Sequence, residues 1–179
     1  MQSHAFTHRH AVAADIAAIT PLMDAAIRDL LRPYLPAEGV AASFEIMGLD
    51  TQLIADGTYH VVEAEGQVVG CGGWSRRATL FGGDHSAGRD AALLDPAHEP
   101  ARVRAMYTHP AWTRRGIGRL ILDLCEAEAA AEGFAACELA ATLAGEPLYR
   151  ACGYVEVERF SADTSTGVAV PLIRMRKAI

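Results

Sequence analysis

Thr113-Arg-Arg-Gly-Ile-Gly-Arg119 joins a predicted strand, Val103–Thr108, to a predicted amphipathic helix. The apolar residues of that helix recur at helical spacing: Ile117, Leu120, Ile121, Leu124, Ala127 and Ala131. A helix N-terminus presents unpaired backbone N–H groups and a partial positive charge. Glycines let the oxygens of a ligand approach those N–H groups closely. The stretch therefore predicts a phosphate-binding turn.

The distribution of charge around this turn supports an anion site. No Asp or Glu occurs between Pro100 and Leu122, although the whole chain has a net charge of −6. The same segment contains five arginines: Arg102, Arg104, Arg114, Arg115 and Arg119. This pattern indicates a focused anion site rather than a basic surface. The dinucleotide-binding pattern G-x-G-x-x-G is excluded because Ile121 stands at its third glycine, and the Walker pattern is absent.

The elements outward from the turn predict an α+β fold. Upstream, the pattern predicts a strand at Phe6–Val12, a helix capped by Asp15, a helical stretch over Gly39–Ala55 and a hairpin over Thr58–Ser75 that turns at Glu65-Gly66. A polar loop, Gly82–Pro100, follows. After Arg102 the predicted order is strand, turn, helix, strand, short helix and two strands. This order is typical of a largely antiparallel sheet around one βαβ unit.

Composition limits the broad class of the protein. With 179 residues, 51% of them hydrophobic, we expect one domain spanning residues 1–179. No run is long enough to cross a membrane, and residues 1–10 lack a signal segment, so we expect a cytoplasmic protein that binds no membrane. The acidic balance argues against a nucleic-acid partner. Without a C-x-x-C pair, the four cysteines are expected to be reduced thiols.

Two motifs resemble those of a known family, the GNAT-type N-acetyltransferases. Val103-Arg-Ala-Met-Tyr-Thr-His-Pro110, followed by Arg114-Arg-Gly-Ile-Gly-Arg119, is similar to the central motif of that family. Leu148-Tyr-Arg-Ala-Cys-Gly-Tyr154 is similar to its LYxxxGF segment and lies at the expected distance. The resemblance implies a mixed, mostly antiparallel, twisted sheet of about seven strands, flanked by about four helices, with splayed central strands.

The resemblance also implies that acetyl-CoA binds as co-substrate. Its pyrophosphate would bind the turn, at Arg114, Arg115, Gly116, Ile117, Gly118 and Arg119. Its pantetheine arm would lie along Met106, Tyr107 and Thr108. The family often has Asn where Thr142 stands, so Thr142 is the expected but altered side-chain contact to this arm.

Acetyl transfer needs a neutral amine, a polarised thioester carbonyl and a proton for the leaving thiolate. The family places a tyrosine general acid where Tyr149 stands, and a backbone N–H in Met106–Thr108 would polarise the carbonyl. Some relatives carry a glutamate base at the position of Arg102, and arginine cannot serve as a base at neutral pH. The base stays open between Glu45, Glu63, Asp84 and a water chain.

Two further groups of side chains are candidates for binding the acceptor and a metal ion. The resemblance places the acceptor site between residues 28–45, residues 74–90 and the loop at Ser161–Gly167. Within these segments, Trp74, Arg76 and Arg77, with Phe81, suggest a pocket for an amine that carries a carboxylate or phosphate, since arginine pairs with such groups. The alternative is a sheet edge packed by its own side chains. His8 and His10 would share one face of a strand, but no third ligand is evident, so we expect no metal site.

These observations predict an acetyl-CoA-dependent N-acetyltransferase that acts on a primary amine of a small molecule by direct attack in a ternary complex. Three alternatives stay open: a non-catalytic acyl-CoA-binding module, transfer of a larger acyl group, and acetylation of protein amines. A final strand containing Pro171 is compatible with a homodimer or with a blunted sheet edge.

Overall fold

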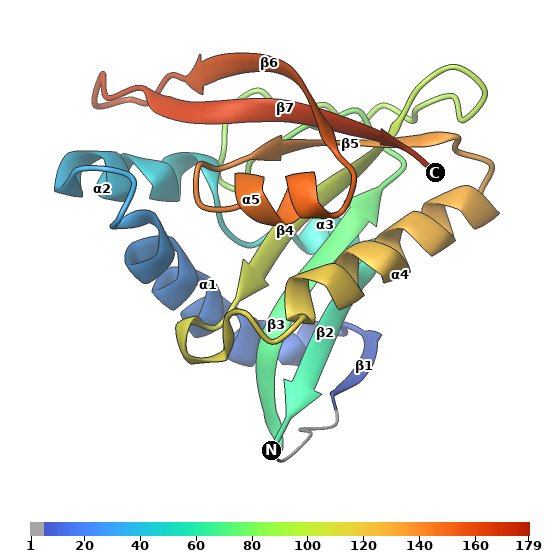
Figure 1. Cartoon of the computed structure of the whole chain (residues 1–179), viewed down its shortest axis with the longest axis horizontal. Helices are drawn as coiled ribbons and strands as arrows, with labels where there is room; N and C mark the ends of the chain where they lie inside the picture. Colours follow the sequence, from blue (N-terminus) through green and yellow to red (C-terminus); the bar gives the residue numbers. More distant parts are fainter. Residues whose placement is uncertain (1–5) are drawn as a thin grey trace.

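A seven-stranded mixed sheet forms the centre of the protein (Figure 1). The computed structural model describes residues 6–179. The strands are β1 (Thr7–His10), β2 (Tyr59–Ala64), β3 (Gln67–Ser75), β4 (Ala101–Thr108), β5 (Ala136–Ala141), β6 (Val155–Ala162) and β7 (Val170–Ala178). They lie in the order β1-β2-β3-β4-β5-β7-β6, and within the described residues only β4 and β5 pair in parallel. The predicted fold class is confirmed.

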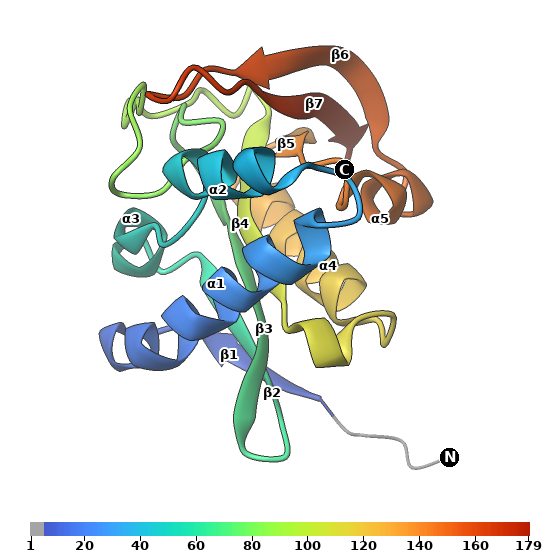
Figure 2. The same ribbon diagram turned by 90° about the vertical axis from the view of Figure 1, so that its left-hand side faces the viewer.

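Helices cover both faces of this sheet (Figure 2). They are α1 (Ile16–Leu31), α2 (Ala37–Ile46), α3 (Thr51–Ala55), α4 (Ile117–Ala131) and α5 (Glu146–Ala151), with 3-10 turns at Ala13–Asp15 and Pro110–Trp112. Helix α1 packs on β3 and β4 from one side, and α4 packs on β2, β3 and β4 from the other. In α1 the buried positions follow the helical period: Ile19, Leu22, Met23, Ala26, Ile27 and Leu31.

Alternation along β2 divides the core between the two faces. Val61 packs with Ile27 and the rest of α1, whereas Val62 packs with Ile121 and the rest of α4. The hairpin of β2 and β3 turns at Glu65-Gly66 as predicted, and both turn residues have positive φ. This is the backbone that a two-residue hairpin turn requires.

The predicted helical stretch over Gly39–Ala55 is wrong in one respect, because it is two helices. Helix α2 ends at Ile46, and Gly48 has a φ of +129°, which no helix contains. Asp50 then starts α3, where its side chain accepts a hydrogen bond from the backbone N–H of Gln52 at 3.1 Å. A glycine and an N-cap residue together interrupt the helix.

The polar loop between β3 and β4 is fixed to the rest of the fold. Arg89 pairs with the buried Asp50 at 2.9 Å, and the hydroxyl and backbone of Thr79 bond the backbone of Asp90. All four cysteines are buried and free. In the described part of the chain, no helix combines the length and the apolar character needed to cross a bilayer.

Candidate active site

Strands β4 and β5 separate soon after they start. They pair at only two described positions, Ala101 with Cys137 and Arg102 with Glu138. Ala105 in β4 has a φ of +51°, and the register with β3 shifts beside it. Such a bulge bends a strand away from its neighbour. The Tyr59 hydroxyl donates a 2.7 Å hydrogen bond to the Ala105 carbonyl and supports the bulge from the α1 side.

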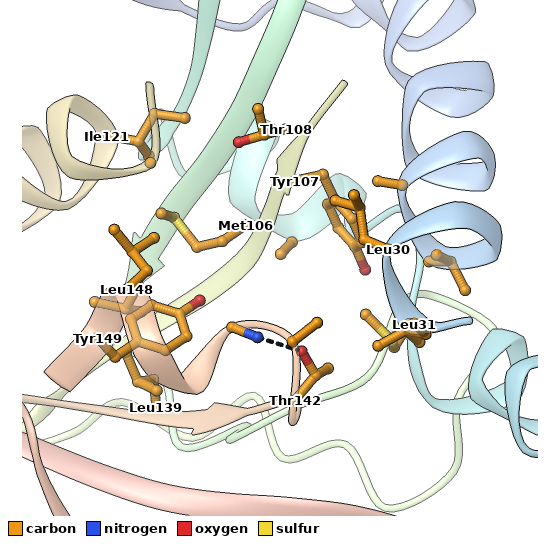
Figure 3. A pocket seen from close by; sticks show the side chains of 18 of the residues that line it. Leu30, Leu31, Met106, Tyr107, Thr108, Ile121, Leu139, Thr142, Leu148 and Tyr149 are labelled. Atoms are coloured by element: carbon orange, nitrogen blue, oxygen red, sulfur yellow. Dashed lines mark hydrogen bonds between the residues drawn. The ribbon is translucent and has the colours of Figure 1, made fainter. Parts of the chain in front are cut away.

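A cavity of about 700 Å³ opens where the two strands diverge. Its walls come from β4, the start of α4, α5 and the α1–α2 region (Figure 3). Met106, Tyr107 and Thr108 line it, as the sequence predicts for the pantetheine arm. The backbone of these three residues has no partner in β5, so it is available to a ligand on that side.

The start of α4 forms one end of the cavity. Gly116 is the N-cap of the helix, with a φ of +89°, and Gly116, Ile117, Gly118 and Arg119 all line the cavity. The first intrahelical bond runs from the N–H of Leu120 to the Gly116 carbonyl, so the N–H groups before it are unpaired within the helix. The predicted anion cradle therefore opens into the cavity.

The two glycines of the turn have different structural roles. A Cβ on Gly116 would meet no atom within 4 Å, so there the backbone conformation favours glycine. A Cβ on Gly118 would lie 2.6 Å from Leu148 Cδ2, so there the close approach of α5 favours glycine. Gly118 thereby brings α5, and Tyr149 with it, against the cradle.

Only part of the cluster of arginines serves the cavity. Arg102 pairs with Glu138 at 2.6 Å, and Arg104 pairs with the buried Asp50 at 2.7 Å. The guanidinium of Arg115 lies 4.6 Å from the centre of the Trp112 ring, and Arg115 does not line the cavity. Arg104, Arg114 and Arg119 do line it, but Arg104 is neutralised by Asp50. Arg114 and Arg119 are the cations best placed to neutralise a pyrophosphate.

Tyr149 projects from α5 into the cavity (Figure 3). Its ring packs edge-on against Tyr154, and its hydroxyl has no hydrogen-bond partner among the described residues. Burial raises the pKa of this phenol, so it is protonated at neutral pH. Thr142 lies just before α5, where its Oγ1 accepts a 3.1 Å hydrogen bond from the Gly145 N–H, which leaves its own proton for a ligand.

A comparison of the sequence with models of known families identifies the family of this chain. A sequence model described as an acetyltransferase (GNAT) domain matches residues 55–156, more than half of the chain. The chain belongs to the GNAT acetyltransferase family. As a member of it, the protein is an acetyl-CoA-dependent N-acetyltransferase. No curated protein matches the chain.

Solved structures share the fold of this GNAT domain over nearly its whole length. A GCN5-related N-acetyltransferase from Rhodopseudomonas palustris has a TM-score of 0.71 at 19% identity, over 100% of this chain and 98% of its own. A putative acetyltransferase from Salmonella typhimurium, solved with its cofactor acetyl-CoA, has a TM-score of 0.63 at 20% identity, over 97% and 94%. A ribosomal-protein-alanine N-acetyltransferase from Brucella melitensis has a TM-score of 0.64 at 20% identity, over 97% and 99%.

The residues predicted to hold the acceptor lie elsewhere in this GNAT domain. Trp74, Arg76 and Arg77 do not line the large cavity. Trp74 is buried, Arg76 pairs with Glu132 at 2.6 Å and Arg77 pairs with Asp56 at 2.7 Å. Both guanidinium groups are neutralised by carboxylates of the protein itself, so this geometry gives the predicted acceptor pocket no support.

The half of the cavity away from α4 is formed by α1, the segment after α2 and the loop after β3: Asp29, Leu30, Tyr34, Met47, Leu80 and Phe81. All of these except Met47 lie in the segments 28–45 and 74–90, where the resemblance places the acceptor. Among the described lining residues, Asp29 is the only carboxylate. The helical periodicity of α1 shows which residues are buried, but it does not single out Asp29.

The three carboxylates considered as bases have other partners. Glu45 accepts hydrogen bonds from Ser165, Glu63 from Arg9 and Asp84 from the Thr51 N–H. None of them lines the cavity. Of the candidates that the sequence offers for the base, only the water chain does not depend on these three carboxylates.

Proposed function

We propose that this protein transfers the acetyl group of acetyl-CoA directly to a primary amine of a small molecule. One observation carries the proposal: a single cavity of about 700 Å³ holds the helix cradle, the unpaired β4 backbone, the Tyr149 hydroxyl and the Asp29 carboxylate. Both substrates would therefore lie in one chamber, as attack within a ternary complex requires.

The donor half fits the shape and the charge of CoA. The pyrophosphate would accept hydrogen bonds from the N–H groups of Gly116–Arg119, beside Arg114. The pantetheine arm would run along the free side of Met106–Thr108 and pair with it as an additional strand does. The Salmonella structure contains acetyl-CoA on the same fold, which supports this assignment.

The acceptor half favours a small amine with an apolar portion. Its walls are largely leucine, methionine and aromatic side chains, and Asp29 at the edge would attract an ammonium group. Direct attack is supported because none of the four cysteines lines the cavity. Burial also raises the pKa of Cys71 and Cys137, each to about 12, which suppresses their thiolates.

In the proposed reaction the amine nitrogen forms a bond to the acetyl carbon and the carbon–sulfur bond of the thioester breaks. The ammonium form releases one proton through water to solvent before attack, because the unbound amine has a pKa of ~10. A backbone N–H in Met106–Thr108 polarises the carbonyl, and the Tyr149 hydroxyl gives its proton to the leaving thiolate. After attack the nitrogen releases a second proton, which returns through water to the Tyr149 phenolate.

A ligand-dependent melting experiment followed by turnover tests the proposal. We expect acetyl-CoA and CoA, but not ATP, to raise the melting temperature. At a hundredfold excess over Kd, the bound ligand should add ~2.7 kcal/mol to the free energy of unfolding. A panel of small primary amines and of peptides with free N-termini would then be assayed for release of CoA thiol. Turnover confined to the peptides would overturn the small-molecule assignment. The absence of any melting shift would overturn the proposal that the start of α4 binds the pyrophosphate of CoA.

Tyr149→Phe tests the general acid separately. We expect kcat to fall by about 100-fold with little change in the KM for acetyl-CoA, because the phenol acts in the transition state. Tyr154→Phe is the matched control, because its hydroxyl is buried outside the cavity. Full activity in Tyr149→Phe would refute the acid role.

A further inference from the structure

A second group of functional side chains lies near the other end of α4, on the face of the sheet that this helix covers. His10 in β1 and His60 in β2 stand opposite each other in the strand register, with ring centres 4.5 Å apart. Glu128 of α4 reaches both: its two oxygens lie 2.7 Å from His10 Nε2 and 3.2 Å from His60 Nε2. We propose that His10, His60 and Glu128 bind a first-row divalent cation of the Zn²⁺ class.

The burial of His60 is the observation that points to a ligand. The residue is only 2% exposed, and neither ring nitrogen makes a hydrogen bond, because the 3.2 Å contact of Nε2 with Glu128 Oε2 lacks hydrogen-bond geometry. A buried polar atom without a hydrogen bond is costly, so the environment favours an added partner for Nε2. Two imidazoles and one carboxylate form a donor set that Zn²⁺ and its neighbours in the first row prefer.

The distances are suitable for one ion. The three ligand atoms lie within 4.8 Å of one another. Ligand atoms around a tetrahedral Zn²⁺ at 2.0–2.1 Å are about 3.3 Å apart, so small side-chain movements would accommodate it. A cavity of about 240 Å³ borders His10 and Glu128 and provides entry and room for a water as fourth ligand.

The surroundings orient the carboxylate and limit repulsion. The indole N–H of Trp74 donates a 2.8 Å hydrogen bond to Glu128 Oε2 and fixes the side chain, as outer partners of metal ligands do. The nearest cation in this cavity, Arg76, is paired with Glu132 at 2.6 Å. This explains why Trp74 and Arg76 gather here rather than at the acceptor half.

The site would be structural. It would tie β1 and β2 to α4, and Glu128 is eleven positions after Ile117, about 16 Å along the helix from the cradle. The inference is therefore independent of the proposed acetyl transfer. This metal site could not be predicted from the sequence, because its three ligands are separated by 50 and 68 residues along the chain.

Calorimetric titration of the EDTA-treated, desalted full-length chain with ZnCl₂ tests the site. We expect one equivalent to bind, and Glu128→Gln and His10→Ala each to weaken binding at least tenfold. Both variants preserve the core, because Gln keeps an acceptor for Trp74 and the His10 side chain is 53% exposed. His98→Ala is the control, because His98 is an exposed loop histidine outside this group of three residues. Equal binding by Glu128→Gln and wild type, or an equal loss in His98→Ala, would overturn the site.

Melting temperature gives a second readout. Zn²⁺ should raise it for the wild type and for His98→Ala but not for Glu128→Gln, and cooperative melting of each metal-free variant would show that it folds. Acetyl transfer should proceed at the same rate with EDTA or with Zn²⁺. A rate that depended on Zn²⁺ would refute the structural role of the ion.

Discussion

At the scale of single residues, Gly118 permits the contact between α4 and α5. A Cβ there would lie 2.6 Å from a methyl group of Leu148, the residue before Tyr149. We expect Gly118→Ala to lower stability by about 1 kcal/mol and to raise the KM for acetyl-CoA several-fold, because α5 must move away from the cradle. Thermal melting and steady-state kinetics measure the two effects.

A double-mutant cycle provides the control for this contact. Adding Leu148→Ala to Gly118→Ala removes the clashing methyl groups, so the two effects should be clearly less than additive. Additive losses would show that the glycine acts through its backbone and not through space for Leu148. Gly116→Ala should show no such coupling, because nothing lies near its Cβ position.

Residues could be predicted from the sequence where local geometry determines their place. The turn around Gly116 and the position of Tyr149 follow from a strand, a helix start and a short helix that are adjacent in the chain, and both line the cavity. For this side of the acceptor site the resemblance indicates only the segment 28–45, and Asp29 itself could not be singled out, because its relation to the cradle depends on how α1 crosses the sheet. Trp74 and Arg76, which the sequence predicts at the acceptor, line a smaller cavity instead, because Trp74 lies at the end of β3 and Arg76 directly follows the strand.

At the scale of elements, Asp50 joins α3, β4 and the loop before β4. It caps α3 through the Gln52 N–H and pairs with Arg104 at 2.7 Å and Arg89 at 2.9 Å, while only 1% of it is exposed. We expect Asp50→Asn to destabilise the protein by about 3 kcal/mol, because the change leaves the Arg104 charge buried without compensation. Urea unfolding measures the loss.

Asp84→Asn is the matched control for that substitution. Asp84 is exposed and accepts a hydrogen bond from the Thr51 N–H, which an amide oxygen can also accept. Its effect should stay within about 0.5 kcal/mol. Similar losses in the two variants would mean that the Asp50 charge contributes nothing specific. The predicted helical stretch over Gly39–Ala55 is interrupted at this same place, because Asp50 is the N-cap of α3.

At the scale of the whole molecule, the sheet order accounts for the site better than any single motif does. Strands β4 and β5 pair for two positions and then diverge, and the α4 start, α5 and α1 close the gap between them. The order of predicted elements was enough to anticipate a mixed sheet. The divergence rests on the bulge at Ala105 and its support by Tyr59, two residues 46 positions apart, and no local pattern reports such a contact.

Two ion pairs, Arg9 with Asp15 and Arg77 with Asp56, make the stability of the whole fold depend on pH. Hydrogen bonds from Arg9 lower the pKa of Asp15, and hydrogen bonds from Arg77 lower the pKa of Asp56, in each case against the opposing effect of burial. A carboxyl group with a lowered folded-state pKa binds fewer protons than it does in the unfolded chain. Its contribution is complete above the unfolded value of about 3.8 to 4 and is lost as the pH falls through the folded value.

We therefore expect the melting temperature to fall steeply below about pH 4.5, and to fall less steeply there in the double variant Asp15→Asn/Asp56→Asn. The variant should start from a lower melting temperature at pH 7, because both ion pairs are already absent, so the two curves should converge in acid. Melting at a series of pH values in low salt measures this. Parallel curves would show that these two carboxylates do not contribute to the acid sensitivity, since an amide cannot titrate in this range.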